Sequence, residues 1–166
     1  MKKVKLVVAY DGTNYCGWQI QPNGVTIEQK LNEALTQLLG EDIKVTGASR
    51  TDAGVHSLGN VCVFETSSRM PAEKISFALN QRLPEDIVVQ SSCEVDERFH
   101  PRFSKSKKTY EYRILNRKMR MPTRRLDTYF SIMSWMWQPC RRPPDIWWGS
   151  MTLRVSAQLT PSQRLP

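Results

Sequence analysis

Apolar and polar residues alternate near the start of the chain, where Val4, Leu6 and Val8 are separated by Lys5 and Val7. Alternation with a period of two is typical of a strand that buries one face. The pattern therefore predicts a first strand in this stretch. Further short apolar runs predict four more strands, over residues 43–45, over 60–64, beginning at 87–89, and over 107–115.

Two segments have the period of amphipathic helices. Thr26 followed by Gln29 resembles a capping box, and Gly40 is a good C-terminal stop. The apolar stripe between these ends predicts a helix with buried residues Ile27, Leu31, Ala34, Leu35, Leu38 and Leu39. Pro71 and Pro84 bracket a second predicted helix with its stripe at Ile75, Ala78, Leu79 and Leu83.

The resulting order of elements is β-α-β-β-α-β with one further strand. It predicts an α+β protein of the ferredoxin-like (RRM-like) type, with an antiparallel sheet, two helices on one face and an extra strand. In that last strand Tyr110, Tyr112 and Ile114 fall on one face. Such folds commonly host RNA binding, but a fold alone does not decide function.

The loop over residues 46–57 lies between two predicted strands and concentrates reactive residue types. It holds Arg50, Asp52 and His56, together with two glycines. Catalytic groups tend to lie on loops held by a rigid sheet, and glycine permits close approach to a ligand. The closeness of Arg50 to Asp52 predicts an ion pair that keeps the carboxylate ionised and oriented. An ordinary solvated turn has the same spacing, so the pattern alone leaves both interpretations open.

Positive charge is concentrated in one segment. Residues 1–97 contain nine Lys or Arg and thirteen Asp or Glu, whereas residues 98–125 contain eleven Lys or Arg and one acid. Such concentration suits contacts with nucleic-acid phosphates. Aromatic residues interleave with these charges and could stack on bases: Phe99, Phe103, Tyr110 and Tyr112. A solvated basic loop is the alternative.

The remaining composition excludes several classes of protein. The four cysteines lack the paired spacing of metal sites, and the chain has only two histidines, which argues against a zinc site and favours reduced, structural thiols. No apolar run has the length of a membrane span, and no signal-peptide pattern follows Met1. We therefore expect a cytoplasmic protein with no membrane partner.

One string is highly specific, the Arg-Thr-Asp-Ala-Gly-Val-His of residues 50–56. Weaker strings accompany it at residues 10–13, 15–19, 26–29, 78–80, 83–87, 99–104 and 108–113. Their identity and order within residues 3–120 resemble the bacterial tRNA pseudouridine synthase A family. That family isomerises uridine to pseudouridine in the anticodon stem-loop of tRNA, and the resemblance implies no metal or other cofactor.

The resemblance also implies roles for individual residues. Asp52 matches the catalytic carboxylate, which either attacks the ribose or uracil or removes a ribose proton. Arg50 is expected to hold Asp52 and to occupy the space left by the flipped nucleotide, and Tyr110 to stack on the uracil. The alternatives are a turn-forming Asp52, a surface charge at Arg50 and a core position for Tyr110. For His56 we expect local hydrogen bonding within the loop.

Contacts with tRNA are expected outside this loop as well. Trp18 and Gln19 either shape the loop or contact RNA. The family implies a homodimer around tRNA. Candidates for phosphate contacts are Arg98, Arg102, Lys105, Lys107 and Lys108.

The end of the chain departs from the family pattern. Residues 131–166 hold four of the five tryptophans and five of the ten prolines, although residues 151–159 alternate as a strand could. We expect a ferredoxin-like domain over residues 1–120 and a basic linker with an irregular tail over residues 121–166. Our hypothesis for this change is a frameshifted or truncated gene product. The coding DNA tests the idea, because one alternative frame after residue 125 should resume the family pattern.

Three functions remain open at this point. The first is a tRNA pseudouridine synthase that uses Asp52. Members of the resembled family continue through a second, related half that completes the active-site cleft. The second function is therefore an inactive RNA-binding domain without that half. The third is a small enzyme that uses Arg50 to bind an acidic small molecule, which leaves the basic segment unexplained.

Overall fold

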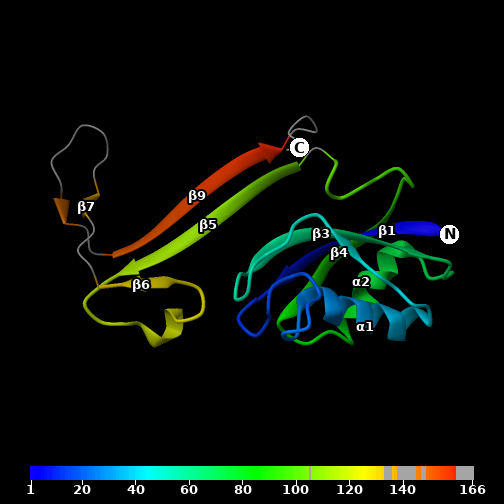
Figure 1. The fold of residues 1–166 in the computed structure, drawn as a ribbon, viewed down its shortest axis with the longest axis horizontal. Helices are drawn as coiled ribbons and strands as arrows, with labels where there is room; N and C mark the ends of the chain where they lie inside the picture. Colours follow the sequence, from blue (N-terminus) through cyan, green and yellow to red (C-terminus); the bar gives the residue numbers. More distant parts are fainter. Residues whose placement is uncertain (105, 133–135, 138–144, 147–148, 160–166) are drawn as a thin grey trace. The chain divides into compact units, whose positions relative to one another are not determined.

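A computed structural model describes residues 1–104, 106–132, 136–137, 145–146 and 149–159 (Figure 1). The chain divides into two compact units, Met1–Ser104 and Lys105–Pro166, and each unit has its own sheet. The domain limit expected at residue 120 stays a prediction.

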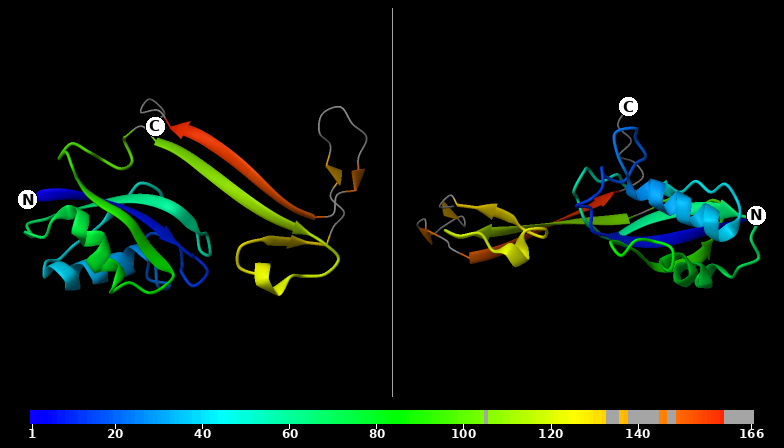
Figure 2. Two further views of the ribbon diagram at one scale, coloured as in Figure 1. Left: turned by 180° about the vertical axis from the view of Figure 1, so that it is seen from behind. Right: turned by 90° about the horizontal axis from the view of Figure 1, so that it is seen from below.

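The first unit is built on an antiparallel sheet with the strand order β2-β3-β1-β4. Two helices lie on one face of this sheet, as Figure 1 and the two views of Figure 2 show. The α+β, ferredoxin-like prediction is therefore confirmed. The elements are β1 (Lys2–Tyr10), α1 (Ile27–Leu39), β2 (Thr46–Gly47), β3 (Ser57–Thr66), α2 (Ala72–Asn80) and β4 (Ile87–Val95).

The core lies between the sheet and the helices. Val4, Leu6 and Val8 of β1 are fully buried, as their alternation predicts. Removal of such side chains from water is the main force that holds helices against a sheet. The helices contribute Ile27, Leu31, Ala34, Leu35, Ile75 and Leu79, while Leu38, Leu39 and Leu83 are partly buried at the margin.

The ends of the helices follow local chemistry. The Thr26 hydroxyl caps α1 by accepting a hydrogen bond from the Gln29 N–H (3.3 Å), and Gly40 ends it with φ of 70°. Helix α2 stops at Asn80, short of Pro84, and the Asn80 side-chain amide bonds to both backbone groups of Val89 in β4. In the described ranges, no helix is long and apolar enough to cross a membrane.

The prediction of a strand over residues 43–45 is wrong, because the strand that joins the sheet is Thr46–Gly47 instead. Ile43 and Val45 are buried in the core. Their N–H groups bond to side chains of α1, at Thr36 Oγ1 (3.2 Å) and Asn32 Oδ1 (2.9 Å). Side chains of the helix thus accept the hydrogen bonds that these backbone N–H groups would otherwise donate to a neighbouring strand.

In the second unit the predicted last strand is confirmed as β5, which pairs antiparallel with β9 and parallel with β6. The alternation over residues 151–159 is realised as β9. The irregular tail that we expected therefore does not hold over residues 149–159. The elements are β5 (Ser106–Asn116), the 3₁₀ helix η1 (Pro122–Arg124), β6 (Tyr129–Ser131), β7 (Met136–Trp137), β8 (Asp145–Ile146) and β9 (Gly149–Leu159).

The cap of α1 gives a first prediction. Thr26→Ala should lower the free energy of unfolding by about 1 kcal/mol, because the first turn loses a side-chain acceptor for its amides. Thr26→Ser keeps that oxygen and is the matched control. Urea unfolding followed by far-UV circular dichroism measures the change. Equal midpoints for Thr26→Ala and the unaltered chain would contradict the role of the cap.

Candidate functional site

The loop over residues 48–56, between β2 and β3, is bound to the loop that follows β1. The Trp18 N–H donates to the Thr51 carbonyl (3.0 Å), and the Gly54 N–H donates to the Tyr15 carbonyl (3.2 Å). These two bonds flank Asp52 in the sequence. The backbone around this carboxylate is therefore held from both sides.

Two glycines allow the loops to come this close. A Cβ atom on Gly12 would lie 2.1 Å from the Val55 carbonyl oxygen, and one on Gly17 would lie 2.4 Å from that of Thr51. Gly17 also has a φ of 85°, which side chains rarely tolerate. Any larger residue would push the two loops apart.

Side chains of the sheet add further anchors. The Tyr10 and Thr51 hydroxyl groups are 2.8 Å apart, and the Asn60 amide donates to the Ser49 carbonyl (3.1 Å). Burial raises the pKa of Tyr10, so its hydroxyl stays protonated at neutral pH. Both anchors come from β1 and β3, which ties the loop to the sheet of this unit.

Trp18 lies beneath this loop rather than on the surface. It is 2% exposed, and its ring centroid is 5.9 Å from that of Tyr10. A Cβ atom on Gly47 would lie 2.5 Å from the indole Nε1. Of the two roles left open by the sequence, the structure supports loop shaping for Trp18, whereas Gln19 is exposed.

Arg50 and Asp52 both have exposed side chains. The predicted ion pair between them is not formed, although both residues belong to the described part of the chain. The attraction between two solvated charges is weak and does not offset the side-chain entropy that is lost when an ion pair forms. The loop is instead held by its backbone, and both side chains face solvent.

His56 contacts the loop that follows β1, and not only its own loop, where we expected its hydrogen bonds. Its Nδ1 lies 3.0 Å from Asp11 Oδ1 and 3.1 Å from the Gly12 N–H. A neutral Nδ1 accepts from Gly12, and a protonated one donates to Asp11. The hydroxyl and N–H of Thr13, and then His56, lower the pKa of Asp11.

Sequence reasoning missed a contact between Tyr15 and Asp86. The buried Tyr15 donates its hydroxyl proton to Asp86 Oδ1 (2.5 Å), and the Asp11 N–H donates to the Asp86 carbonyl (2.9 Å). Burial and this carboxylate raise the pKa of Tyr15. The bond joins positions 71 residues apart, so no local spacing could have predicted it.

The candidates for phosphate contacts differ in their exposure to solvent and in their hydrogen bonds. Arg98 is exposed and Lys108 is half-buried. Arg102 donates its Nε–H to the Gly47 carbonyl (3.0 Å), so it also contacts the start of the loop. Lys105 and the side chain of Lys107 lie outside the described residues.

Tyr110 lies on β5 in the second unit and is 52% exposed. A core position, which was the alternative interpretation, does not fit this exposure. Tyr112 is also exposed, and both alternate along the strand with Glu111 and Arg113. The strand therefore presents two tyrosine rings on one of its faces.

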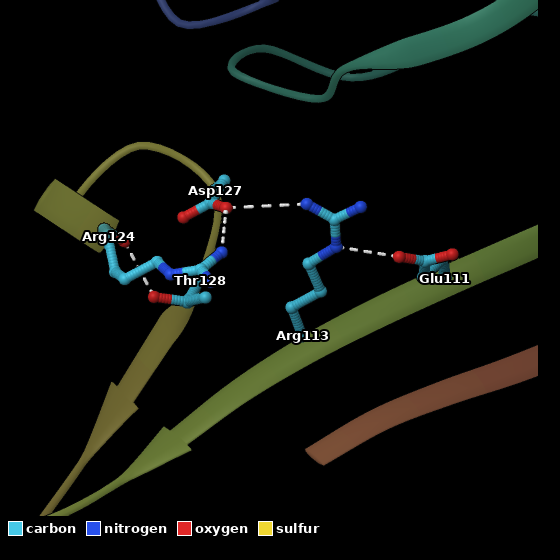
Figure 3. Close-up of polar contacts among 5 residues, drawn as sticks. All are labelled: Glu111, Arg113, Arg124, Asp127 and Thr128. Carbon is cyan, nitrogen blue, oxygen red and sulfur yellow. Dashed lines mark hydrogen bonds and ion pairs between the residues drawn. The ribbon is translucent and has the colours of Figure 1, made fainter. Parts of the chain in front are cut away.

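A polar network joins β5 to the residues that follow it (Figure 3). Arg113 contacts Glu111 (2.6 Å) and Asp127 (3.3 Å), and Arg124 contacts the same Asp127 oxygen (3.0 Å). Thr128 donates its hydroxyl proton to the Arg124 carbonyl (2.6 Å). Two arginines of the basic segment are thus paired with carboxylates.

The family model described as tRNA pseudouridine synthase matches residues 6–104, which include the whole candidate loop and its anchors. The chain belongs to this family. This match confirms the resemblance that the sequence motifs indicated.

Curated relatives agree with this assignment. The tRNA pseudouridine synthase A of Thermoanaerobacter sp. (strain X514) is 51% identical over 125 residues, which cover 75% of this chain and 51% of that protein. That of Ruminiclostridium cellulolyticum is 53% identical over 116 residues, covering 70% and 47%. That of Geotalea daltonii is 46% identical over 129 residues, covering 78% and 53%. The chain spans about half the length of the curated relatives it matches.

Two glycines with positive φ provide a matched pair of substitutions. Gly17→Ala and Gly54→Ala impose similar backbone strain, with φ of 85° and 78°. We expect each to cost on the order of 1 kcal/mol of stability for this reason. Gly17→Ala should cost more, because its Cβ meets the Thr51 carbonyl while that of Gly54 meets nothing within 4 Å.

Chemical unfolding and hydrogen exchange of the loop peptide measure the two effects. Faster loop exchange is expected in Gly17→Ala, since the hydrogen bond from Trp18 to Thr51 is displaced. Equal losses of stability in the two variants would show that the close approach is not a constraint.

Asp11 gives a prediction on pH. Its pKa is lower in the folded chain than the value of about 3.9 in an unfolded one, so its ionised form stabilises the fold above that pH. This stability is lost as the pH falls through the folded pKa. Asp11→Asn should therefore be less stable than the unaltered chain at pH 7, and the difference should shrink below pH 4.

Unfolding midpoints between pH 7 and pH 3 test this expectation. Asp42→Asn is the matched control, because Asp42 is exposed and its nearest cation, Lys44, is 3.9 Å away. A difference for Asp11→Asn that stays constant over this range would contradict the proposed linkage.

Proposed function

We propose that this chain contributes the Asp52 loop of a tRNA pseudouridine synthase, which isomerises uridine to pseudouridine in the anticodon stem-loop of tRNA. The observation that carries the proposal is the loop itself. It has the family's specific string at residues 50–56, its backbone is anchored on both sides, and its central carboxylate is exposed to solvent.

The reaction breaks the N-glycosidic bond of uridine, turns the uracil and joins its C5 atom to the ribose. The substrate and the product have the same atoms and the same oxidation state, so the proposal invokes no cofactor. A carboxylate at Asp52 can attack the ribose or the uracil as a nucleophile, or remove a ribose proton as a base. Each route requires the carboxylate to be held in place, which the backbone bonds of Thr51 and Gly54 support.

The other roles follow from exposure and charge. The target nucleotide has to leave its stack before Asp52 can reach it. Arg50, exposed beside Asp52, is proposed to occupy the vacated space, and exposed Tyr110 to stack on the uracil. Arg98, Arg102 and Lys108 are proposed to bind phosphates. We further propose that the protein acts in the cytoplasm as a homodimer.

A second candidate function is RNA binding without turnover. It is supported by the basic segment and by exposed aromatic rings such as Phe103, neither of which requires catalysis. The two candidates differ only in whether uridine is converted.

Release of tritium from C5-labelled uridine in tRNA measures the conversion, because C5 loses its hydrogen when the new bond forms. Asp52→Asn keeps the size of the side chain and removes its charge, and should lower the rate by about 10²- to 10⁴-fold. Asp42→Asn is the matched control and should leave the rate unchanged. Equal rates for Asp52→Asn and the unaltered chain would remove Asp52 from its proposed role.

Binding of the same tRNA separates the two candidate functions. Binding that weakens steeply with salt, without tritium release by the unaltered chain, would favour the second candidate. A flat salt response would count against phosphate contacts in both.

A further inference from the structure

The residues that follow β4, 96–104, form a strap of two hydrogen-bonded turns. The Phe99 N–H donates to the Asp96 carbonyl (2.9 Å). The N–H and the hydroxyl of Ser104 both donate to the His100 carbonyl, at 3.1 and 2.8 Å. Local bonds of this kind give the strap a defined shape of its own.

The strap lies across β1 on the face of the sheet opposite the helices. Lys3 donates to the Glu97 carbonyl (2.6 Å), and the Lys5 ammonium lies 6.0 Å from the centroid of the Phe99 ring. Both lysines alternate along β1 with the core residues, so they point away from the helices. The strap thus covers part of a face that the core does not use.

Arg102 of the strap reaches β2, at the other edge of the sheet from β4. Its Nε–H donates to the Gly47 carbonyl (3.0 Å). Gly47 pairs with Cys62 and packs against Trp18, so it is a firm anchor. The chain runs from Gly47 directly into the loop that carries Asp52.

The guanidinium of Arg102 has more donors than this one bond uses. A guanidinium carries five N–H groups in a planar fork, and the hydrogen bond to Gly47 takes one of them. Arg102 is exposed, so its terminal N–H groups can be reached from solvent. Paired N–H groups of this kind match the oxygen atoms of a phosphate.

We propose that Arg102 is a positioning residue that couples RNA binding to the Asp52 loop. Its Nε–H holds the start of the loop through Gly47, and its terminal N–H groups bind a phosphate of the RNA backbone. A bound phosphate orients the guanidinium and so stabilises its bond to Gly47. The phosphate part rests on the proposed function, whereas the bond to the loop is independent of it.

Lysine cannot replace arginine in this role. Its three donors lie on one nitrogen atom, so it lacks the planar fork whose Nε–H bonds the carbonyl while separate terminal nitrogen atoms bind a phosphate. Arg102→Lys therefore keeps the charge and removes the coupling, while Arg102→Ala removes both. Arg82→Lys is the matched control, because Arg82 also donates to a backbone carbonyl, that of Ala78 (3.1 Å), at the end of α2.

Hydrogen exchange followed by mass spectrometry measures the exchange rate of the loop peptide over residues 48–56. It is applied to the unaltered full chain and to its Arg102→Lys, Arg102→Ala and Arg82→Lys variants. Without RNA we expect exchange in this peptide to be on the order of tenfold faster in both Arg102 variants and unchanged in Arg82→Lys. With an anticodon stem-loop RNA added to saturation, exchange should slow in the unaltered chain and in Arg82→Lys but not in Arg102→Lys. Circular dichroism checks that each variant is folded.

Unaltered loop exchange in Arg102→Ala and Arg102→Lys would overturn the proposal. Equal protection by RNA in Arg102→Lys and the unaltered chain would overturn its phosphate part. If the unaltered chain binds no RNA, the proposed function and the phosphate part fail together, and the exchange rates of the free proteins still decide the contact with the loop.

Discussion

The close backbone contact between the loop after β1 and the loop over residues 48–56 is the constraint on which the candidate site depends. Gly12 and Gly17 make it possible, because a side chain at either position would overlap a carbonyl of the facing loop. The hydrogen bonds of Trp18 and Gly54 then lock the contact on both sides of Asp52. The sheet carries this arrangement, since β1 leads into one loop while β2 and β3 flank the other.

In this arrangement the groups that hold the loop differ from the charged side chains that the loop exposes. Backbone groups and buried side chains such as Asn60 hold the loop, and they leave Arg50 and Asp52 exposed. An ion pair between two solvated side chains would contribute at most about 1 kcal/mol, which is similar to a single well-made backbone hydrogen bond. A loop held by its backbone can therefore present its charged groups to a substrate without loss of its shape.

Charge is also distributed less simply than the residue counts suggest. The segment over residues 98–125 has a large excess of Lys and Arg. Arg113 and Arg124, however, are paired with carboxylates, and Asp127 joins them to each other. Arg102 in turn contacts the backbone of β2. Part of the positive charge thus stabilises local structure, and a count of charges overstates what is available to bind phosphates.

The sequence was sufficient for features that depend on neighbours along the chain. The alternation of Val4, Leu6 and Val8 and the cap at Thr26 predicted elements that the structure contains. The specific string at residues 50–56 indicated the family that the comparisons identify. Periodicity, capping and short motifs are local properties, so they can be read before the fold is known.

Tertiary structure decided the features that join distant positions. Ile43 and Val45 look like a strand, but their amides bond to side chains of α1, and the strand begins at Thr46. The spacing of Arg50 and Asp52 suggested an ion pair, yet both side chains are exposed to solvent and do not form it. The contact between Arg102 and Gly47 spans 55 residues. Such contacts depend on which surfaces the fold brings together and on how much water remains between them. The spacing of residues along the chain reports neither of these.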